Sequence, residues 1–154
     1  MQVQDIMTRI VKTARPDSNL AEVVEVMWTQ NCGFVPLVDA EGKVTGVVTD
    51  RDIAIALGTR GVRAPELTSA EVASAPVVSC TSDENLYTAL KTMGERKVRR
   101  LVVLDGNSEL AGVLSMDDVV LYVEKSGYYE VLKAMRALTD RNIPALVASA
   151  AVSG

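Results

Sequence analysis

The chain has 154 residues, of which 48% are hydrophobic and 23% charged, and its formal net charge is −4. This composition predicts one folded domain or two small, closely packed ones, and argues against a disordered chain. The chain contains no histidine, which excludes a Ser-His-Asp or Cys-His nucleophile and any metal site that needs imidazole. The acidic balance argues against duplex DNA as the main partner.

The two cysteines, Cys32 and Cys80, are far apart and form no CxxC motif. They are therefore expected to be free thiols of a reducing compartment. The N-terminus lacks a basic segment followed by an apolar run, and no stretch approaches the roughly 20 apolar residues of a membrane span. We expect a cytoplasmic, soluble protein without membrane insertion.

An internal repeat with an offset of 66 residues organises the chain. Residues 43–53 resemble residues 109–119. The same offset holds without a gap along most of the chain, and it pairs Val11 with Val77, Asp17 with Asp83, Asn19 with Asn85, Leu20 with Leu86, Met27 with Met93, and Asp39 with Asp105. A gapless register of this length predicts a tandem duplication.

The first repeat is expected to contain a strand, a helix, two strands and a second helix. The first strand is expected near residues 10–13, and Asp17 or Ser18 is expected to cap the first helix. The 3–4 spacing of apolar residues predicts the buried stripe of that helix at Leu20, Val23, Val24 and Met27. Strands are then expected at 34–38 and 44–48 with a turn at 39–42, and a second helix is expected to open at Thr49.

A linker rich in Gly and Pro, residues 58–65, is expected between the repeats, and Thr68 to Glu71 resembles a capping box that opens the second one. The second repeat is then predicted to follow the same order. Its expected elements are a strand at 77–80, a helix with the stripe Leu86, Leu90 and Met93 capped by Ser82 or Asp83, strands at 101–104 and 110–114 with a turn at 105–108, and a helix opening at Ser115.

The expected fold is therefore α/β (α+β), with two β-α-β-β-α repeats packed face to face around a pseudo-two-fold axis. A single copy of about 55 residues would be only marginally stable alone, and two copies bury the sheet faces that one leaves exposed. The expected boundaries are 2–57 for the first repeat, 58–67 for the linker, 68–123 for the second repeat, and 124–154 for a C-terminal helix, over 130–141, and a tail.

The ordered set of motifs resembles a pair of cystathionine-β-synthase-type (CBS) domains. The resemblance rests on residues 5–8, 34–39 and 46–52 of the first repeat and on residues 98–105 and 112–118 of the second. It implies a Bateman module, which is usually dimeric and binds AMP, ADP, ATP or S-adenosylmethionine in the clefts between its repeats. Such pairs regulate an enzyme or transporter, so the resemblance implies a regulated partner.

Two acidic residues, Asp52 and Asp118, are the candidates for binding a ribose, because a carboxylate accepts protons from both hydroxyls of a vicinal diol. Thr49 and Ser115 lie three residues earlier and offer a hydroxyl to a sugar or phosphate at a helix N-terminus. Gly46 and Gly112 allow close approach of backbone or ligand. The same Thr/Ser-x-x-Asp spacing also forms an ordinary capping box, which stabilises a helix by ~1 kcal/mol without any ligand.

A basic cluster spans residues 96–100. Arg99 and Arg100 open a strand expected to line the cleft, and the stretch resembles one in the kinase-regulating gamma subunit family where basic residues contact phosphates. We therefore predict phosphate contacts for Arg100 first and Arg99 second. Gly33 and Phe34 occupy the equivalent positions of the first repeat, so the two clefts are expected to differ chemically.

These observations predict a non-catalytic sensor that needs no cofactor or metal and binds an adenine nucleotide as a regulatory ligand. The expected partners are an adenosyl compound, a second copy of the chain and an unidentified regulated protein, with nucleic acid disfavoured. The alternative is a CBS scaffold that has lost its ligand and acts through protein–protein contacts. An enzyme ranks third, because no converging set of catalytic side chains is evident in the sequence.

Overall fold

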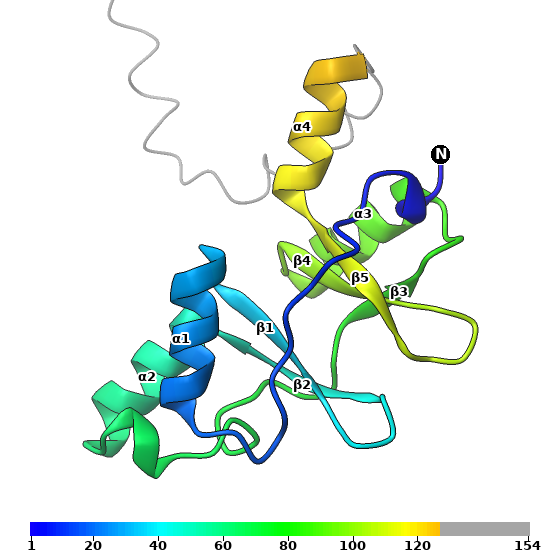
Figure 1. Ribbon diagram of the computed structural model, residues 1–154. Helices are drawn as coiled ribbons and strands as arrows, with labels where there is room; N and C mark the ends of the chain where they lie inside the picture. The colour runs from blue at the N-terminus through cyan, green and yellow to red at the C-terminus, as the bar shows by residue number, and fades with distance from the viewer. Residues whose placement is uncertain (127–154) are drawn as a thin grey trace, which may run out of the picture.

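The computed structural model describes residues 1–126 and has a mixed α/β fold (Figure 1). The expected helix over 130–141 and the tail lie outside the described residues. In chain order the elements are η1 (Val3–Asp5), α1 (Leu20–Gln30), β1 (Phe34–Val38), β2 (Val44–Thr49), α2 (Asp50–Arg60), η2 (Ala64–Glu66), β3 (Ser79–Thr81), α3 (Leu86–Arg96), β4 (Arg100–Leu104), β5 (Leu110–Ser115) and α4 (Met116–Ser126).

The first repeat is built on the antiparallel hairpin of β1 and β2. Helices α1 and α2 cover one face of this hairpin (Figure 1). The expected stripe of α1 is confirmed at Leu20, Val23 and Met27, which are buried, whereas Val24 is 41% exposed. The 3–4 spacing therefore identified the buried face of this helix and misassigned one residue at its margin.

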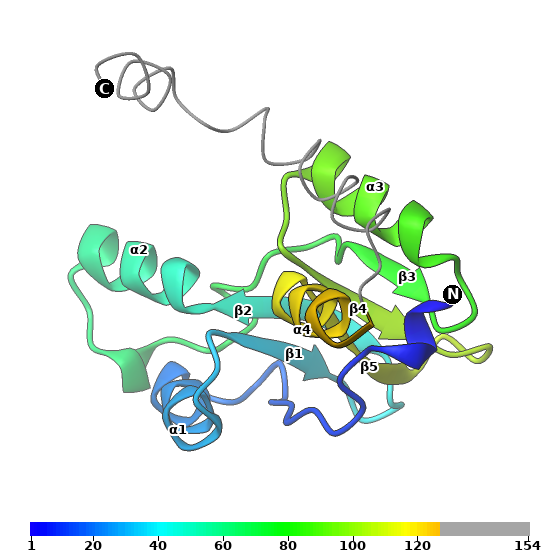
Figure 2. The ribbon, with the colours of Figure 1, turned by 90° about the horizontal axis from the view of Figure 1, so that it is seen from above.

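The second repeat repeats this plan with one additional strand. Its hairpin of β4 and β5 is antiparallel, and the short strand β3 joins the edge of β4 in parallel. Leu86, Leu90 and Met93 form the buried stripe of α3, as predicted. Seen from above, α4 is viewed almost end-on and begins near the junction of the two repeats (Figure 2). The strand order expected from the sequence is therefore present in full in this repeat.

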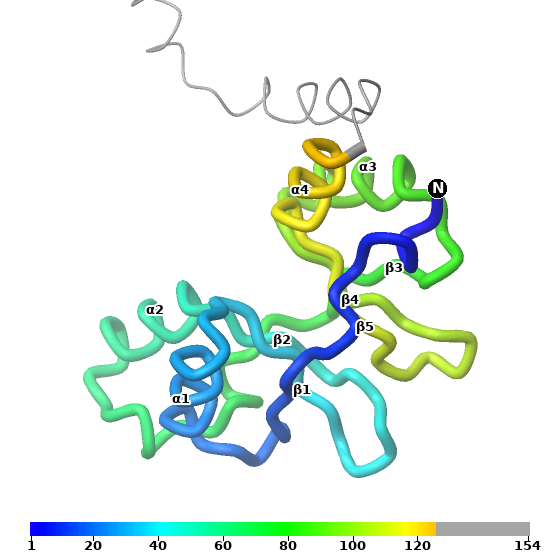
Figure 3. Tube along the Cα trace, turned by 45° about the horizontal axis from the view of Figure 1, so that its top comes forward, coloured from blue at the N-terminus to red at the C-terminus, as the bar shows by residue number. Residues whose placement is uncertain are grey.

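The N-terminal segment of the chain packs against the second repeat. Val3 and Met7 lie in the same buried cluster as Leu90 and Leu114. Thr8 forms an isolated antiparallel bridge with Val113 of β5. The segment then crosses to the first repeat, where Ala14 bridges Leu37, a path that Figure 3 follows in blue.

The start of the second repeat, together with Leu67 just before it, makes the reciprocal exchange. Leu67 is buried in the core of the first repeat, and Ser74 bridges Val47 of β2. Ser74 and Val47 are the positions equivalent to Thr8 and Val113 at the 66-residue offset. Because each repeat lends its first segment to the other, the two halves are joined by a pseudo-two-fold exchange. The residue bounds expected for the two repeats, 2–57 and 68–123, stay a prediction.

Three local expectations were wrong. No strand forms over 10–13, where the chain crosses between the repeats with a single bridge at Ala14. The caps of α1 and α3 are Asn19 and Asn85, whose side chains accept the backbone N–H of Glu22 and Tyr87. The residues of the expected box at 68–71 make its hydrogen bond from the Thr68 N–H to the Glu71 carboxylate, but they form a turn rather than a helix.

No helix within residues 1–126 is long and apolar enough to cross a membrane.

Candidate functional site

The N-terminus of α2 carries the first pair of candidate residues. The Thr49 hydroxyl accepts the Asp52 N–H at 3.1 Å, and the Thr49 N–H donates to Asp52 Oδ2 at 3.0 Å. The Thr49 hydroxyl also donates to Asp52 Oδ2 at 2.6 Å. These hydrogen bonds make a complete capping box. Both residues are half-buried.

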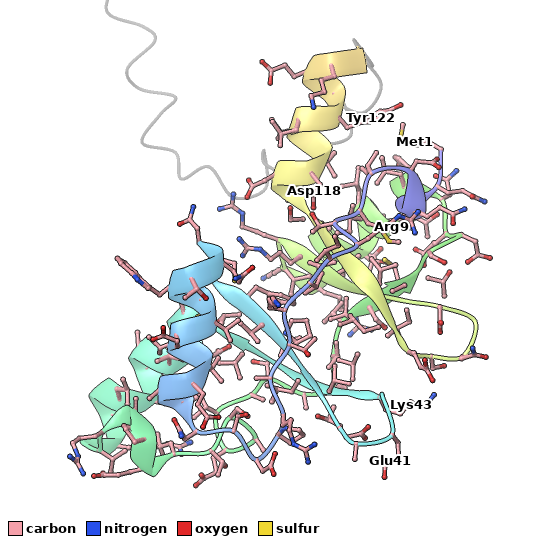
Figure 4. All side chains as sticks on the ribbon, in the orientation of Figure 1. Met1, Arg9, Glu41, Lys43, Asp118 and Tyr122 are labelled. Atoms are coloured by element: carbon pink, nitrogen blue, oxygen red, sulfur yellow. The ribbon has the colours of Figure 1, made fainter. Side chains whose placement is uncertain are left out.

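The N-terminus of α4 carries the second pair in the same arrangement. The Ser115 N–H and hydroxyl both donate to Asp118 Oδ2, at 2.8 and 2.6 Å, and the Ser115 hydroxyl accepts the Asp118 N–H at 3.2 Å. Asp118 lies at the base of α4, above the crossing segment that carries Arg9 (Figure 4). The duplicated motif therefore has duplicated geometry.

The two carboxylates differ at their second oxygen. Thr8, on the crossing segment, donates its hydroxyl to Asp118 Oδ1 at 3.0 Å. The equivalent residue of the other half is Ser74, and it makes no such bond to Asp52 within residues 1–126. Thr8 was not predicted as a site residue, although it belongs to residues 5–8, which carry part of the family resemblance.

The glycines Gly46 and Gly112 are needed for backbone contact between the repeats. A Cβ at Gly112 would lie 2.5 Å from the carbonyl oxygen of Thr8, and one at Gly46 would lie 3.0 Å from the Cβ of Ala73. The close approach expected on these strands is therefore explained by the exchanged segments. It does not require a ligand.

The residues at the starts of β1 and β4 have different surroundings in the two repeats. Arg99 is exposed, and Arg100 is half-buried with its guanidinium carbon 6.0 Å from the centre of the Phe34 ring. In the first repeat, the Asp50 carboxylate lies over Gly33, at 2.5 Å from where a Cβ would be. The equivalent of Asp50 at the 66-residue offset is the neutral Met116.

The pairing of the strands brings one arginine to the second cap. Arg100 is the cross-strand partner of Ser115, and Phe34 is the partner of Thr49. Side chains of directly opposed residues in an antiparallel pair lie on the same face of the sheet. The side chains of Arg100 and Ser115 are therefore neighbours. Arg99 contacts the start of α4 through its backbone, because its carbonyl accepts the N–H of Met116.

Neither cysteine belongs to this arrangement. Cys32 is exposed and Cys80 is buried in the core of the second repeat. Burial raises the pKa of the Cys80 thiol to about 12, and the carboxylate of Glu84 adds to this effect. Residues 1–126 contain no cluster of three or more cysteine, aspartate or glutamate side chains placed to hold a metal ion.

A comparison with known protein families matches both halves of the chain. The model of the CBS domain matches residues 3–59 and again residues 70–125. The chain belongs to the CBS domain family. It contains a tandem CBS pair, as the sequence resemblance predicted.

Several curated proteins are similar to this chain over more than three quarters of its length. The CBS domain-containing protein YhcV of Bacillus subtilis is 33% identical over 119 residues, which are 77% of this chain and 83% of that protein. An uncharacterized protein of Methanopyrus kandleri, MK0525, is 28% identical over 120 residues, covering 78% of this chain and 61% of the relative. The inosine-5′-monophosphate dehydrogenase of Methanocaldococcus jannaschii is 29% identical, and this chain matches only 23% of its length.

Solved CBS pairs have the same fold. The CBS domain pair of protein MJ0100, solved with 5′-methylthioadenosine and S-adenosyl-L-methionine, has a TM-score of 0.73 at 24% identity, over 82% of this chain and 98% of the other. The CBS domain protein PAE2072 of Pyrobaculum aerophilum, solved with AMP, has a TM-score of 0.72 at 21% identity, over 82% and 100%. At these identities the likeness establishes the architecture of the chain.

Proposed function

We propose that this CBS pair is a non-catalytic sensor that binds an adenosyl nucleotide between its repeats. The observation that carries the proposal is the Thr/Ser–Asp box, which occurs at the start of both α2 and α4 with matching hydrogen bonds. Asp52 and Asp118 are assigned to the ribose, Thr49 and Ser115 to sugar or phosphate, and Arg99 and Arg100 to phosphate. Binding changes the angle between the repeats or the shape of a dimer.

The chemistry of the boxes leaves room for a nucleotide in addition to the cap. A cap uses one carboxylate oxygen, and in both repeats that oxygen is Oδ2. Each carboxylate oxygen has two lone pairs, so both side chains retain acceptor sites for the hydroxyls of a ribose. The first turns of α2 and α4 also place backbone N–H groups and the positive end of a helix dipole next to these side chains.

The solved neighbours support the choice of ligand class. One CBS pair of this fold was crystallised with AMP, and another with S-adenosyl-L-methionine and 5′-methylthioadenosine. All three compounds contain an adenosyl group and differ in what is attached to its 5′ carbon. An adenosyl group is therefore the common part that we assign to this chain, and the 5′ substituent is the part that the arginines select.

An equilibrium titration tests this proposal directly. AMP, ADP, ATP, S-adenosylmethionine and NAD are each titrated calorimetrically into the purified chain. Saturable binding of at least one of them at micromolar concentration is the expected result. If none of the five binds, the alternative is favoured, in which the pair is a scaffold that acts through protein–protein contacts with a regulated protein.

We further propose that the chain forms a homodimer. The surface of the helices supports this, because several large apolar side chains of α1, α2 and α4 are exposed, namely Val24, Trp28, Ile55, Val120 and Leu121. Ile55 and Leu121 occupy equivalent positions of the two repeats, so both halves offer an apolar helix face to a partner. Sedimentation should give the mass of two chains, and a monomer at high micromolar concentration would contradict the dimer.

A further inference from the structure

Arg100 and Phe34 form a contact between equivalent positions of the two repeats. The guanidinium carbon of Arg100 lies 6.0 Å from the centre of the Phe34 ring, which is within the range of a cation–π interaction. The two residues begin β4 and β1 and are 66 positions apart. Two positions related by a pseudo-two-fold axis touch each other only beside that axis, so this contact marks the junction of the repeats.

The contact also connects the two capping boxes. Phe34 is the cross-strand partner of Thr49, and Arg100 is the partner of Ser115. Directly opposed side chains of an antiparallel pair lie about 5 Å apart on the same face. The side chain of Arg100 therefore begins beside the box of the second repeat, and its guanidinium lies over the Phe34 ring, which is beside the box of the first repeat.

The charge of Arg100 has no stronger partner in the described part of the chain. The ion pairs among residues 1–126 are Arg15–Asp17, Arg63–Glu66 and Lys91–Glu95, and Arg100 makes no hydrogen bond there through its side chain. A cation–π contact at a partly exposed site is weak, whereas an arginine binds phosphate through two parallel charge-assisted hydrogen bonds. An arginine can stack on a ring with its face and bind a phosphate with its edge when both partners lie at the same place. Here the ring lies beside the box of the first repeat, whereas a phosphate at the N-terminus of α4 would lie beside Ser115 of the second. A phosphate bound there would therefore draw the guanidinium toward Ser115 and off the ring.

We propose that Phe34 is a specificity-determining residue, because it competes with the phosphate of a bound nucleotide for the guanidinium of Arg100. This inference rests on the proposed function, since it concerns the same sites. Binding a nucleotide breaks the contact with Phe34, whereas binding adenosine leaves it in place. The ring therefore lowers the preference of the chain for AMP over adenosine, and its release loosens the junction between the repeats when a phosphate binds.

The test is the ratio of AMP affinity to adenosine affinity, measured by titration calorimetry for the wild type and two Phe34 variants. Phe34→Leu removes the ring and should raise the ratio by about two- to fivefold, which is the strength of an exposed cation–π contact. Phe34→Tyr keeps the ring face and is the matched control, so its ratio should equal that of the wild type. In an Arg100→Ala background, Phe34→Leu should leave the ratio unchanged.

The outcomes separate this inference from the proposed function. If the wild type binds neither AMP nor adenosine, the proposed function fails and the competition fails with it. If both ligands bind and Phe34→Leu leaves their ratio unchanged, the competition alone is overturned. An equal rise of the ratio in the Arg100→Ala background would also overturn it, because the ring would then act through another group.

Discussion

The two repeats are alike where backbone meets backbone and differ where side chains face the junction. Both have an Asn-capped first helix, a Thr/Ser–Asp box and a glycine pressed against the segment exchanged from the other half. They differ at the strand starts, where Gly33 and Phe34 stand in one and Arg99 and Arg100 in the other. The fold therefore requires the shared features, whereas the positions that differ are available to select a ligand.

The largest expected difference is in the reactivity of the two thiols. Cys80 is buried and its pKa is raised from 9.0 to about 12, which lowers its thiolate fraction about a thousandfold near neutral pH. A chromogenic disulfide reagent at about pH 8 should therefore modify one thiol of the folded chain quickly and the second only on unfolding. Cys32→Ser should remove the fast phase. Rapid modification of two thiols in the native chain would contradict the buried position of Cys80.

The glycines beside the exchanged segments offer the next largest contrast. Gly112→Ala should destabilise the chain by about 1–3 kcal/mol, because its Cβ would meet the Thr8 carbonyl oxygen at 2.5 Å. Gly46→Ala should cost less, because its nearest neighbour is the Cβ of Ala73 at 3.0 Å. Denaturant unfolding measures both.

Gly58, inside α2, is the control for these two variants. A Cβ there has no neighbour within 4 Å, so Gly58→Ala should stabilise the chain by roughly 0.5–1 kcal/mol through lower backbone entropy of the unfolded state. If all three alanine variants changed the free energy of unfolding equally, close approach of the exchanged segments would not be the cause.

A smaller effect is expected for the hydroxyl that reaches the second carboxylate. Thr8→Val removes the bond to Asp118 Oδ1 and should lower the free energy of unfolding by about 0.5–1 kcal/mol, the net value of one hydrogen bond. Ser74→Ala at the equivalent position should change it by less. Equal losses in both variants would mean that the asymmetry between the two carboxylates has no energetic weight.

The smallest expected effect concerns the turn between β4 and β5. Backbone N–H groups of Glu109 and Asn107 donate to the Asp105 carboxylate and lower its pKa below the ordinary 3.8. A lowered pKa stabilises the fold above the unfolded value, and this contribution is lost as the pH falls below about 3.8 and through the native pKa. Asp105→Asn should make acid unfolding slightly less steep, and carboxyl NMR titration checks the direction of the shift.

The sequence predicted most of the fold because the 66-residue repeat supplies every element twice. The apolar stripes of α1 and α3, the hairpin strands and the helix starts after Thr49 and Ser115 are confirmed. A strand was also expected over 10–13, and this expectation was wrong. In the structure this stretch crosses between the repeats and pairs with no strand. Ile10 is consequently 92% exposed.

The exchange of segments could not be predicted, because local patterns report what a residue prefers and not which half of the chain it meets. Val3 is fully buried among residues of the second repeat, yet nothing in its neighbours specifies that partner. The Phe34–Arg100 contact has the same origin, since it joins positions that are 66 residues apart. The roles of the six candidate residues in ligand binding stay a prediction.

The assignment of Asp52 and Asp118 to a ribose is tested by AMP titration of Asp118→Ala and Asp52→Ala beside the wild type, with the free energy of unfolding measured on the same samples. We expect loss of either carboxylate to weaken AMP binding at its own site by about 10- to 100-fold, the range of a charge-assisted hydrogen bond. The capping contribution lost is only about 1 kcal/mol. Variants that unfold more easily but bind AMP as the wild type does would contradict the account, because Asp52 and Asp118 would then be helix caps alone.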